Sequence, residues 1–300
     1  MSDASAIRAS VVIPVWNRQT TVRRAIDSLL AQTCPHLEVI VVDNGSTDSS
    51  CDVALSSGDP RVRLIRLAEN TGPSGARNAG AAAAAGPVLG FLDSDDEVVP
   101  EWLASLLAPF DDVDCAAVTC ADSIFPSDPD GPQLVVFPSD MGPAFYRIRG
   151  RFRAGSFLLR TEVFSAIGGY SEELWFAEST EMTFRLAAWC HAYGKSVKSI
   201  ERPLSIWHRG SESRYDMHLD RILFAAEYTI RKHLPQLSLD RRLLANQFSV
   251  AGHCLVRLGR RRDARKYFRR ALVLQPMRPV HAARWIAASS ELTTRLAWRR

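Results

Sequence analysis

The chain has 300 residues, of which 46% are hydrophobic and 23% are charged, as is typical of soluble globular proteins. No apolar run approaches the roughly 20 residues that a transmembrane helix needs, and the N-terminus lacks the basic start and apolar stretch of a secretory signal. Six scattered cysteines without a Cys-x-x-Cys pair indicate free thiols in a reducing compartment, not disulfides or a zinc site. We therefore expect a cytoplasmic protein.

Charge is distributed unevenly along the chain. Residues 1–240 carry a net charge of −9, whereas residues 241–300 carry +13. An acidic body followed by a basic tail indicates two modules with different roles. We predict a first domain at 1–215, with halves at about 9–120 and 121–215, and a basic helical region at 216–300.

Apolar runs alternate with helical patterns in the first 120 residues. Strands are predicted at 10–14, 37–43, 62–67, 88–92 and 115–120, and helices at 20–33, 74–86 and 100–110. Because their apolar residues form continuous rather than alternating runs, the strands predict a mostly parallel sheet with helices on both faces, an α/β fold of the Rossmann-like kind. Residues 122–150 carry five prolines and predict a mobile loop, and the chain reads as helical from about residue 218.

Polar side chains follow three of these predicted strands. Asp43, Asn70 and Asp93 each lie at or soon after a strand end. Since ligands of parallel sheets bind at the carboxyl ends of the strands, we expect these residues to converge on one rim.

The segment FLDSDDEVVP places four acidic residues within five positions, starting at Asp93. Such a cluster would be stabilised by Mg²⁺ or Mn²⁺, which takes one or two carboxylates when it serves a diphosphate. On a tight turn, one carboxylate of Asp93-Ser94-Asp95 would meet a ribose hydroxyl and another the metal. The alternative is a solvated loop in which Asp96 caps the next helix.

Two further segments would complete a nucleotide site. The Asp43 carboxylate would accept a hydrogen bond from a base N–H, although an ordinary Asx turn is the alternative. In NTGPSGARNAG, the amides at the helix start near Gly72, together with Arg77, would neutralise a diphosphate. Close packing of that helix on the sheet is the alternative there.

Taken in order, VVIPVWNR, DNGSTD, GPSGARNAG and FLDSDD resemble the family-2 glycosyltransferases of the GT-A fold, over about residues 9–210. The resemblance implies an inverting transferase that uses a nucleoside diphosphate sugar, most commonly of UDP, with Mg²⁺ or Mn²⁺. It implies metal ligation by Asp95 and by His208, for which a surface histidine is the alternative. The nucleotide-sugar site that it implies consists of Pro14, Val15, Asn17, Asp43, Asn70, Gly72, Arg77, Asp93 and Ser94.

The segment FRAGSFLLRTEVFSAIGGYSEELWFAESTEMTFRLA resembles the acceptor half of the same family. Members usually carry Glu-Asp there, and the aspartate takes the acceptor's proton, but this chain has Glu178-Ser179. A serine cannot act as that base unaided, so Glu178 is the favoured base and Glu181 the second candidate. The alternative is that these acids only complement the helix dipole.

The basic tail and the serine leave other hypotheses open. Residues 251–276 resemble one tetratricopeptide-like helix pair, whose basic face would be a solvated cap, a contact for anionic membrane, or, last in rank, a nucleic-acid patch. A non-catalytic nucleotide-sugar binder is the alternative to an enzyme, and a sugar nucleotidyltransferase ranks third. The sequence encodes no recognisable acceptor.

Overall fold

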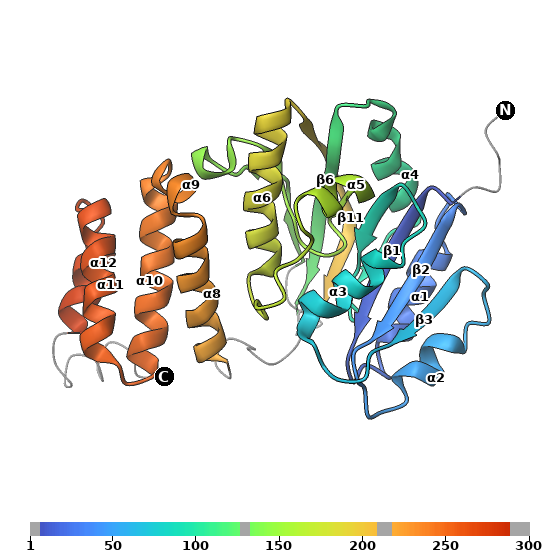
Figure 1. Ribbon diagram of the computed structural model, residues 1–300, viewed down its shortest axis with the longest axis horizontal. Helices are drawn as coiled ribbons and strands as arrows, with labels where there is room; N and C mark the ends of the chain where they lie inside the picture. The colour runs from blue at the N-terminus through green and yellow to red at the C-terminus, as the bar shows by residue number, and fades with distance from the viewer. Residues whose placement is uncertain (1–6, 127–132, 209–217, 289–300) are drawn as a thin grey trace. The chain divides into compact units, whose positions relative to one another are not determined.

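A computed structural model of the protein describes residues 7–126, 133–208 and 218–288 (Figure 1). Contacts divide the chain into two compact units. The first comprises Met1–Met141, Ile148–Glu173 and Glu178–Ser211, and the second comprises Gly142–Arg147, Leu174–Ala177 and Glu212–Arg300. The expectations for the N-terminal segment, for the middle of the proline-rich loop and for both ends of the basic region lie partly outside the described residues.

The first unit begins with four parallel strands in the order β3-β2-β1-β4 (Figure 1). Helices on the connections allow the parallel arrangement, because each strand must return to the same edge before the next begins. The strands are β1 (Ala9–Val15), β2 (Leu37–Asp43), β3 (Val62–Arg66) and β4 (Val88–Phe91). The connecting helices are α1 (Val22–Leu30), α2 (Ser50–Leu55) and α3 (Gly72–Ala82).

The sheet continues as a mixed one, in the order β4-β10-β6-β11-β5. Strand β10 (Phe157–Arg160) is antiparallel to both β4 and β6 (Cys115–Phe125). Strand β11 (Ser196–His208) is parallel to β6 and antiparallel to β5 (Glu97–Val98). The helices that accompany this part of the sheet are α4 (Trp102–Leu107), η1 (Ala108–Asp111), α5 (Thr161–Ala166) and α6 (Glu178–Tyr193).

The α/β fold with a C-terminal helical extension is confirmed. The prediction of a loop at 122–150 is wrong for the residues of this segment that the structure describes. That segment contains the end of β6 and β7 (Leu134–Val136), which pairs with β6. It also contains a two-stranded sheet of β8 (Ser139–Asp140) and β9 (Arg149–Gly150), separated by η2 (Pro143–Phe145). These strands are only two or three residues long and pair within the segment or with the adjoining end of β6, so they fit between its prolines.

Hydrophobic clusters cover both faces of the sheet, and one of them fixes the position of α3. Gly80 of α3 packs on the sheet so closely that a Cβ there would lie 2.4 Å from Val12 Cγ1. The glycine therefore lets the helix approach β1, and this approach sets Arg77, one turn earlier, at the rim of the sheet.

The second unit is helical. It contains α8 (Leu219–Lys232), α9 (Leu234–Ser238), α10 (Arg241–Arg257), α11 (Arg261–Leu274) and α12 (Pro279–Ala287). The α10–α11 connection turns at Gly259, whose φ of +76° favours glycine. The two helices pack around a core that includes Leu255 and Phe268. Within the described ranges, no helix combines the length and the apolar character needed to cross a bilayer.

Candidate functional site

Three strand ends meet at one rim, as the sequence predicts. Val15 at the end of β1 pairs with Asp43 at the end of β2. The next residue, Asn44, is buried and donates hydrogen bonds to Asn70 Oδ1 and to the carbonyl of Gly72, each at 3.0 Å. Asn44 was not predicted, yet it is the side chain that joins the β2 end to the start of α3.

The loop after β1 is fastened to the same rim. Asn17 adopts a left-handed φ of 53°, and its backbone N–H donates to Ser46 Oγ at 3.0 Å. The Ser46 N–H in turn donates to Asp43 Oδ1 at 3.1 Å. Pro14 and Val15 precede this loop in β1. The structure therefore brings the predicted base-binding residues of both loops together.

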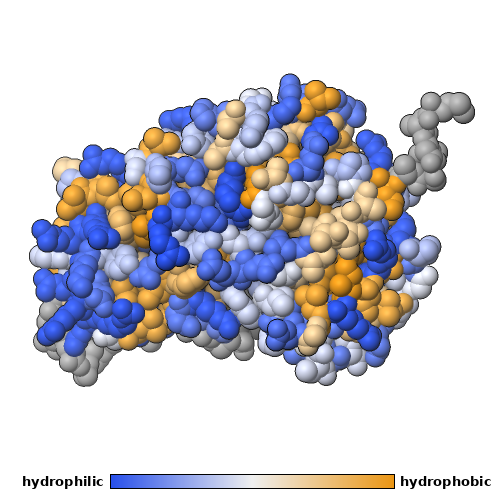
Figure 2. Space-filling model, in the orientation of Figure 1, coloured by the Kyte–Doolittle hydropathy of each residue, from blue (hydrophilic) through white to orange (hydrophobic). Residues whose placement is uncertain are grey.

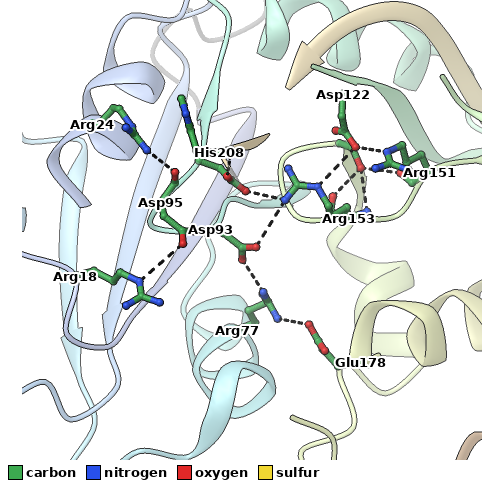
Figure 3. A network of polar contacts seen from close by, with 12 residues as sticks. Arg18, Arg24, Arg77, Asp93, Asp95, Asp122, Arg151, Arg153, Glu178 and His208 are labelled. Carbon is green, nitrogen blue, oxygen red and sulfur yellow. Dashed lines mark hydrogen bonds and ion pairs between the residues drawn. The ribbon is translucent and has the colours of Figure 1, made fainter. Parts of the chain in front are cut away.

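Arg77 connects this rim to the start of α6 (Figure 3). Its buried guanidinium binds Asp93 Oδ1 at 2.7 Å and Glu178 Oε1 at 3.0 Å, and lies over the ring of Tyr170. Burial alone would lower the pKa of Arg77, but the two carboxylates and the tyrosine raise it above its usual value. A permanent positive charge therefore stands between Asp93 and Glu178.

The turn after β4 carries a cluster of carboxylates that fits a metal ion. Asp93, Asp95 and Asp96 each offer an oxygen, and these oxygens lie within 4.8 Å of one another. Ser94 between them is buried. Arg18 approaches Asp95, with 4.0 Å between Nε and Oδ2. Oxygen ligands at this spacing suit Mg²⁺ or Mn²⁺.

Arg153 forms ion pairs with two carboxylates of this turn. Its Nη1 binds the buried Asp96 at 2.7 Å and lies 3.9 Å from Asp93, while its Nε lies 3.7 Å from the buried Asp122. Burial raises the pKa of Asp96 to about 7; Arg153 opposes this rise, and the neighbouring aspartates add to it. Arg153 therefore offsets the repulsion between closely spaced carboxylates.

The network contains side chains that could bind both a cation and an anion. Asp93 and Asp95 gather carboxylates at the acidic turn, and Arg77 and Arg153 lie beside Asp93 (Figure 3). Among the described residues, the buried Nε of Arg77 and the buried Nε and Nη2 of Arg153 donate no hydrogen bond. A divalent ion would be held by the clustered carboxylates of the acidic turn, and an anion such as a diphosphate would satisfy arginine donors.

His208 lies beside the acidic turn because β11 pairs with β5, which follows that turn. Its backbone N–H donates to Asp96 Oδ1 at 3.0 Å. Its ring Nε2 lies 2.6 Å from Glu97 Oε1, a carboxylate that Arg24 also contacts at 3.2 Å. The predicted ligand is thus in place near the metal candidates, although Glu97 holds its Nε2.

The two predicted base candidates differ in their surroundings. Glu178 begins α6, and its side chain is 15% exposed. Glu181 is fully buried and binds Ser171 Oγ at 2.8 Å and Arg185 Nη2 at 2.6 Å. A general base must reach the acceptor's proton, so this geometry favours Glu178 and gives no support to Glu181. Glu181 instead anchors α6.

Several site residues were missed by the sequence reasoning, though the sequence held a signal for some. Asp122 is a lone acid in the otherwise apolar run CAAVTCADSIF. Arg151 and Arg153 alternate around Phe152, and this spacing places them on one side of an extended chain. Both arginines contact Asp122 in the structure. A buried acid and a pair of alternating cations were therefore complementary clues.

We predict strong coupling between Arg153 and Asp96. In a double-mutant cycle of Arg153→Met and Asp96→Asn, the coupling energy for unfolding should reach about 1–3 kcal/mol, because the two side chains form a buried ion pair at 2.7 Å. Urea denaturation of the four proteins measures it. The exposed pair Arg149–Glu201 is the matched control and should couple by about 0–1 kcal/mol. Equal coupling in the two cycles would contradict the role assigned to Arg153.

Comparisons with known proteins agree with this geometry. Part of the chain is 47% identical over 96 residues to the succinoglycan biosynthesis protein ExoO of Rhizobium meliloti, covering 32% of this chain and 28% of that protein. It is 40% identical over 116 residues to the uncharacterized glycosyltransferase YibD of Escherichia coli, covering 37% and 33%. The chain thus matches about a third or less of these relatives' own length.

Solved structures resemble the chain over nearly its whole length. Staphylococcus aureus TarS 1–349 in complex with UDP-GlcNAc superposes with a TM-score of 0.64 at 15% identity, covering 98% of this chain and 93% of TarS 1–349. The UDP complex gives 0.61 at 16% identity with the same coverage. At such identities the likeness establishes the fold, which is that of these GT-A proteins.

A sequence profile of the family described as glycosyl transferase family 2 matches residues 10–171. The matched region contains β1 to β4, the acidic turn and Arg153, and therefore most of the network described above. Because the match extends over more than half of the chain, the protein belongs to glycosyl transferase family 2.

Proposed function

We propose that the protein transfers a sugar from a nucleoside diphosphate sugar to an acceptor nucleophile, with inversion at the anomeric carbon and with help from a divalent metal ion. The observation that carries this proposal is the double contact of Arg77. One guanidinium binds both Asp93, on the donor rim, and Glu178, the candidate base. The proposed donor site and the proposed base would therefore lie next to each other.

The donor nucleotide would lie along the strand-end rim. Pro14, Val15, Asn17 and Asp43 would contact the base, and Asn70, Gly72 and Ser94 would shape the cavity beside the ribose and the phosphates. Asp93 would accept a hydrogen bond from the ribose. TarS crystallises with UDP and with UDP-GlcNAc, which supports UDP as the first nucleotide to test here.

Asp95 would hold Mg²⁺ or Mn²⁺, with Asp93 and Asp96 close by and His208 as a further candidate ligand. Such an ion supplies a positive charge that stabilises the negative charge of the departing diphosphate. Arg77 would act on the same charge through its guanidinium, since its buried Nε donates no hydrogen bond to any described residue.

Glu178 would take the proton from the acceptor. As the acceptor oxygen attacks the anomeric carbon, its O–H proton moves to Glu178 and the bond to the diphosphate breaks on the opposite side of the ring. Direct displacement from the opposite side inverts the anomeric centre. Arg77, held near Glu178 at 3.0 Å, would keep the carboxylate oriented toward the acceptor.

A second candidate function is nucleotide-sugar binding without catalysis. Ser179, in place of the aspartate that family members usually carry, favours it. The three-carboxylate cluster at Asp93, Asp95 and Asp96 opposes it, because binding alone has less need of a metal.

All six cysteines are free thiols and four of them are buried, which supports a reducing compartment for either function.

A donor-hydrolysis screen distinguishes the two functions. The protein is incubated with UDP-, GDP- and dTDP-sugars and Mn²⁺, and the released nucleoside diphosphate is measured over time. A transferase releases one of the three nucleotides slowly with water as acceptor. If one nucleotide binds and no diphosphate is released from any of its sugars, the binding function is correct instead.

A further inference from the structure

One end of the helical unit, which we call the α9 end, combines exposed apolar and basic side chains. Helix α8 ends there, α9 lies across it, α10 and α12 begin there, and α11 ends there (Figure 1). Arg241 at the start of α10 lies near the carbonyl of Val273 in the last turn of α11, with 3.5 Å from Nη2 to O. The two helix ends are therefore neighbours.

Five apolar side chains are exposed at the α9 end. Met277, in the α11–α12 loop, is 93% exposed, and Val273 is 66% exposed. Exposed apolar side chains that gather in one place on a protein surface mark sites that bind a partner or a membrane. The full set is Leu234, Leu239, Val273, Met277 and Val280.

The same end is basic. The exposed cations are Arg231, Lys232, Arg241, Arg242 and Arg278. Asp240 is the acid at the start of α10, and its carboxylate accepts hydrogen bonds from the backbone N–H groups of residues 242 and 243 as the helix cap. Residues 228–242, which cover the end of α8, α9 and the start of α10, contain four Lys or Arg and Asp240 as their one acidic residue. Figure 2 shows hydrophobic and hydrophilic residues interspersed on the visible face of this unit.

We propose that the α9 end docks the protein on a membrane surface rich in anionic lipids. The arginines and the lysine meet the lipid phosphates, and Met277 with its apolar neighbours enters the boundary between headgroups and acyl chains. Charge complementarity selects this partner, because an apolar cluster surrounded by cations matches an anionic interface that is apolar beneath. A nucleic acid would match the charge but would leave the aliphatic side chains in water.

The inference does not depend on the proposed transferase activity, because its test measures binding alone. The full-length protein is sedimented with vesicles of phosphatidylcholine and with vesicles containing phosphatidylglycerol. Binding should require the anionic lipid and should fall as salt rises from about 0.1 M to about 0.5 M, where charges are strongly screened. No binding, or equal binding to both vesicles, would overturn the proposal.

Paired variants locate the surface. Arg241→Glu with Arg242→Glu should weaken binding to anionic vesicles at least tenfold, because each basic residue near the surface contributes about fivefold. Arg261→Glu with Arg262→Glu makes the same charge change at the start of α11, whereas it is the end of α11 that lies at the α9 end. This control pair should have a much smaller effect. Equal losses would mean that only net charge matters and would overturn the placement.

A second pair of variants tests the apolar contribution. Val273→Ser with Met277→Ser should weaken vesicle binding about fivefold or more, while Val113→Ser, which changes a 76% exposed valine in the first unit, should leave it unchanged. Both sites are exposed, so neither change should affect folding. Tighter binding to a double-stranded oligonucleotide than to anionic vesicles would overturn the proposal in favour of nucleic acid.

Discussion

Glu178→Gln is expected to lower kcat for donor hydrolysis by about 10²- to 10⁴-fold, the range that a positioned general base contributes. Glutamine keeps the size of the side chain and an oxygen that can face Arg77, but it cannot accept the acceptor's proton. The affinity for the nucleotide should change little, because the loss falls on a proton transfer in the transition state. Steady-state kinetics and a nucleotide titration measure the two effects separately.

Two variants serve as controls for Glu178. Glu201→Gln changes an exposed carboxylate of the same unit and should leave kcat unaltered. Ser179→Asp restores the residue that the family usually carries and, in the Glu178→Gln background, should recover part of the lost activity. A Glu178→Gln protein with normal kcat would remove this residue from the chemistry.

Asp95→Ala is expected to lower kcat/KM for donor hydrolysis by about 10²-fold or more, because a metal ion supplies several kcal/mol of charge stabilisation. The remaining activity should no longer depend on the concentration of Mn²⁺. Asp95 is partly exposed, so the change should leave the free energy of unfolding nearly unaltered. Kinetics across a Mn²⁺ titration, together with urea denaturation, check both statements.

The control for Asp95 is Asp27→Ala on α1, which removes an exposed carboxylate paired with Arg23. Its kinetics and its response to Mn²⁺ should match those of the wild type. If Asp95→Ala kept the full Mn²⁺ response, the metal would have to be held by other groups.

The first half of the fold could be predicted because its information is local. The runs 37–43 and 88–92 are mostly apolar and do not alternate with polar residues, and both form buried parallel strands. β7 and the short β8–β9 pair were missed because strands of two or three residues, set among prolines, leave too short a pattern to recognise. The predicted helix at 74–86 ends at Ala82, since the last alanines leave the helix before the Gly86-Pro87 break.

The rim was predictable for a similar reason, whereas the supporting contacts were not. Asp43, Asn70 and Asp93 follow strands of one sheet, so topology alone brings them together. The contacts of Arg153 with Asp96 and of Arg77 with Glu178 join residues 57 and 101 positions apart. Spacing in the sequence carries no information about such pairs. In the sequence, the buried pair of Glu181 and Arg185 has the same spacing as an exposed ion pair on a helix surface, so its burial could not be predicted either.

Calorimetric titration is the most direct test of the proposed nucleotide-sugar site. The wild-type protein is titrated with UDP, GDP and dTDP, each with Mn²⁺ and with a chelator. One nucleotide, with UDP the first expectation, should bind tightly with Mn²⁺ and at least tenfold more weakly with the chelator. Asp95→Ala should bind that nucleotide equally weakly in both conditions. Binding that is indifferent to the metal, or no binding of any of the three, would contradict a metal-assisted nucleotide-sugar site at the acidic turn.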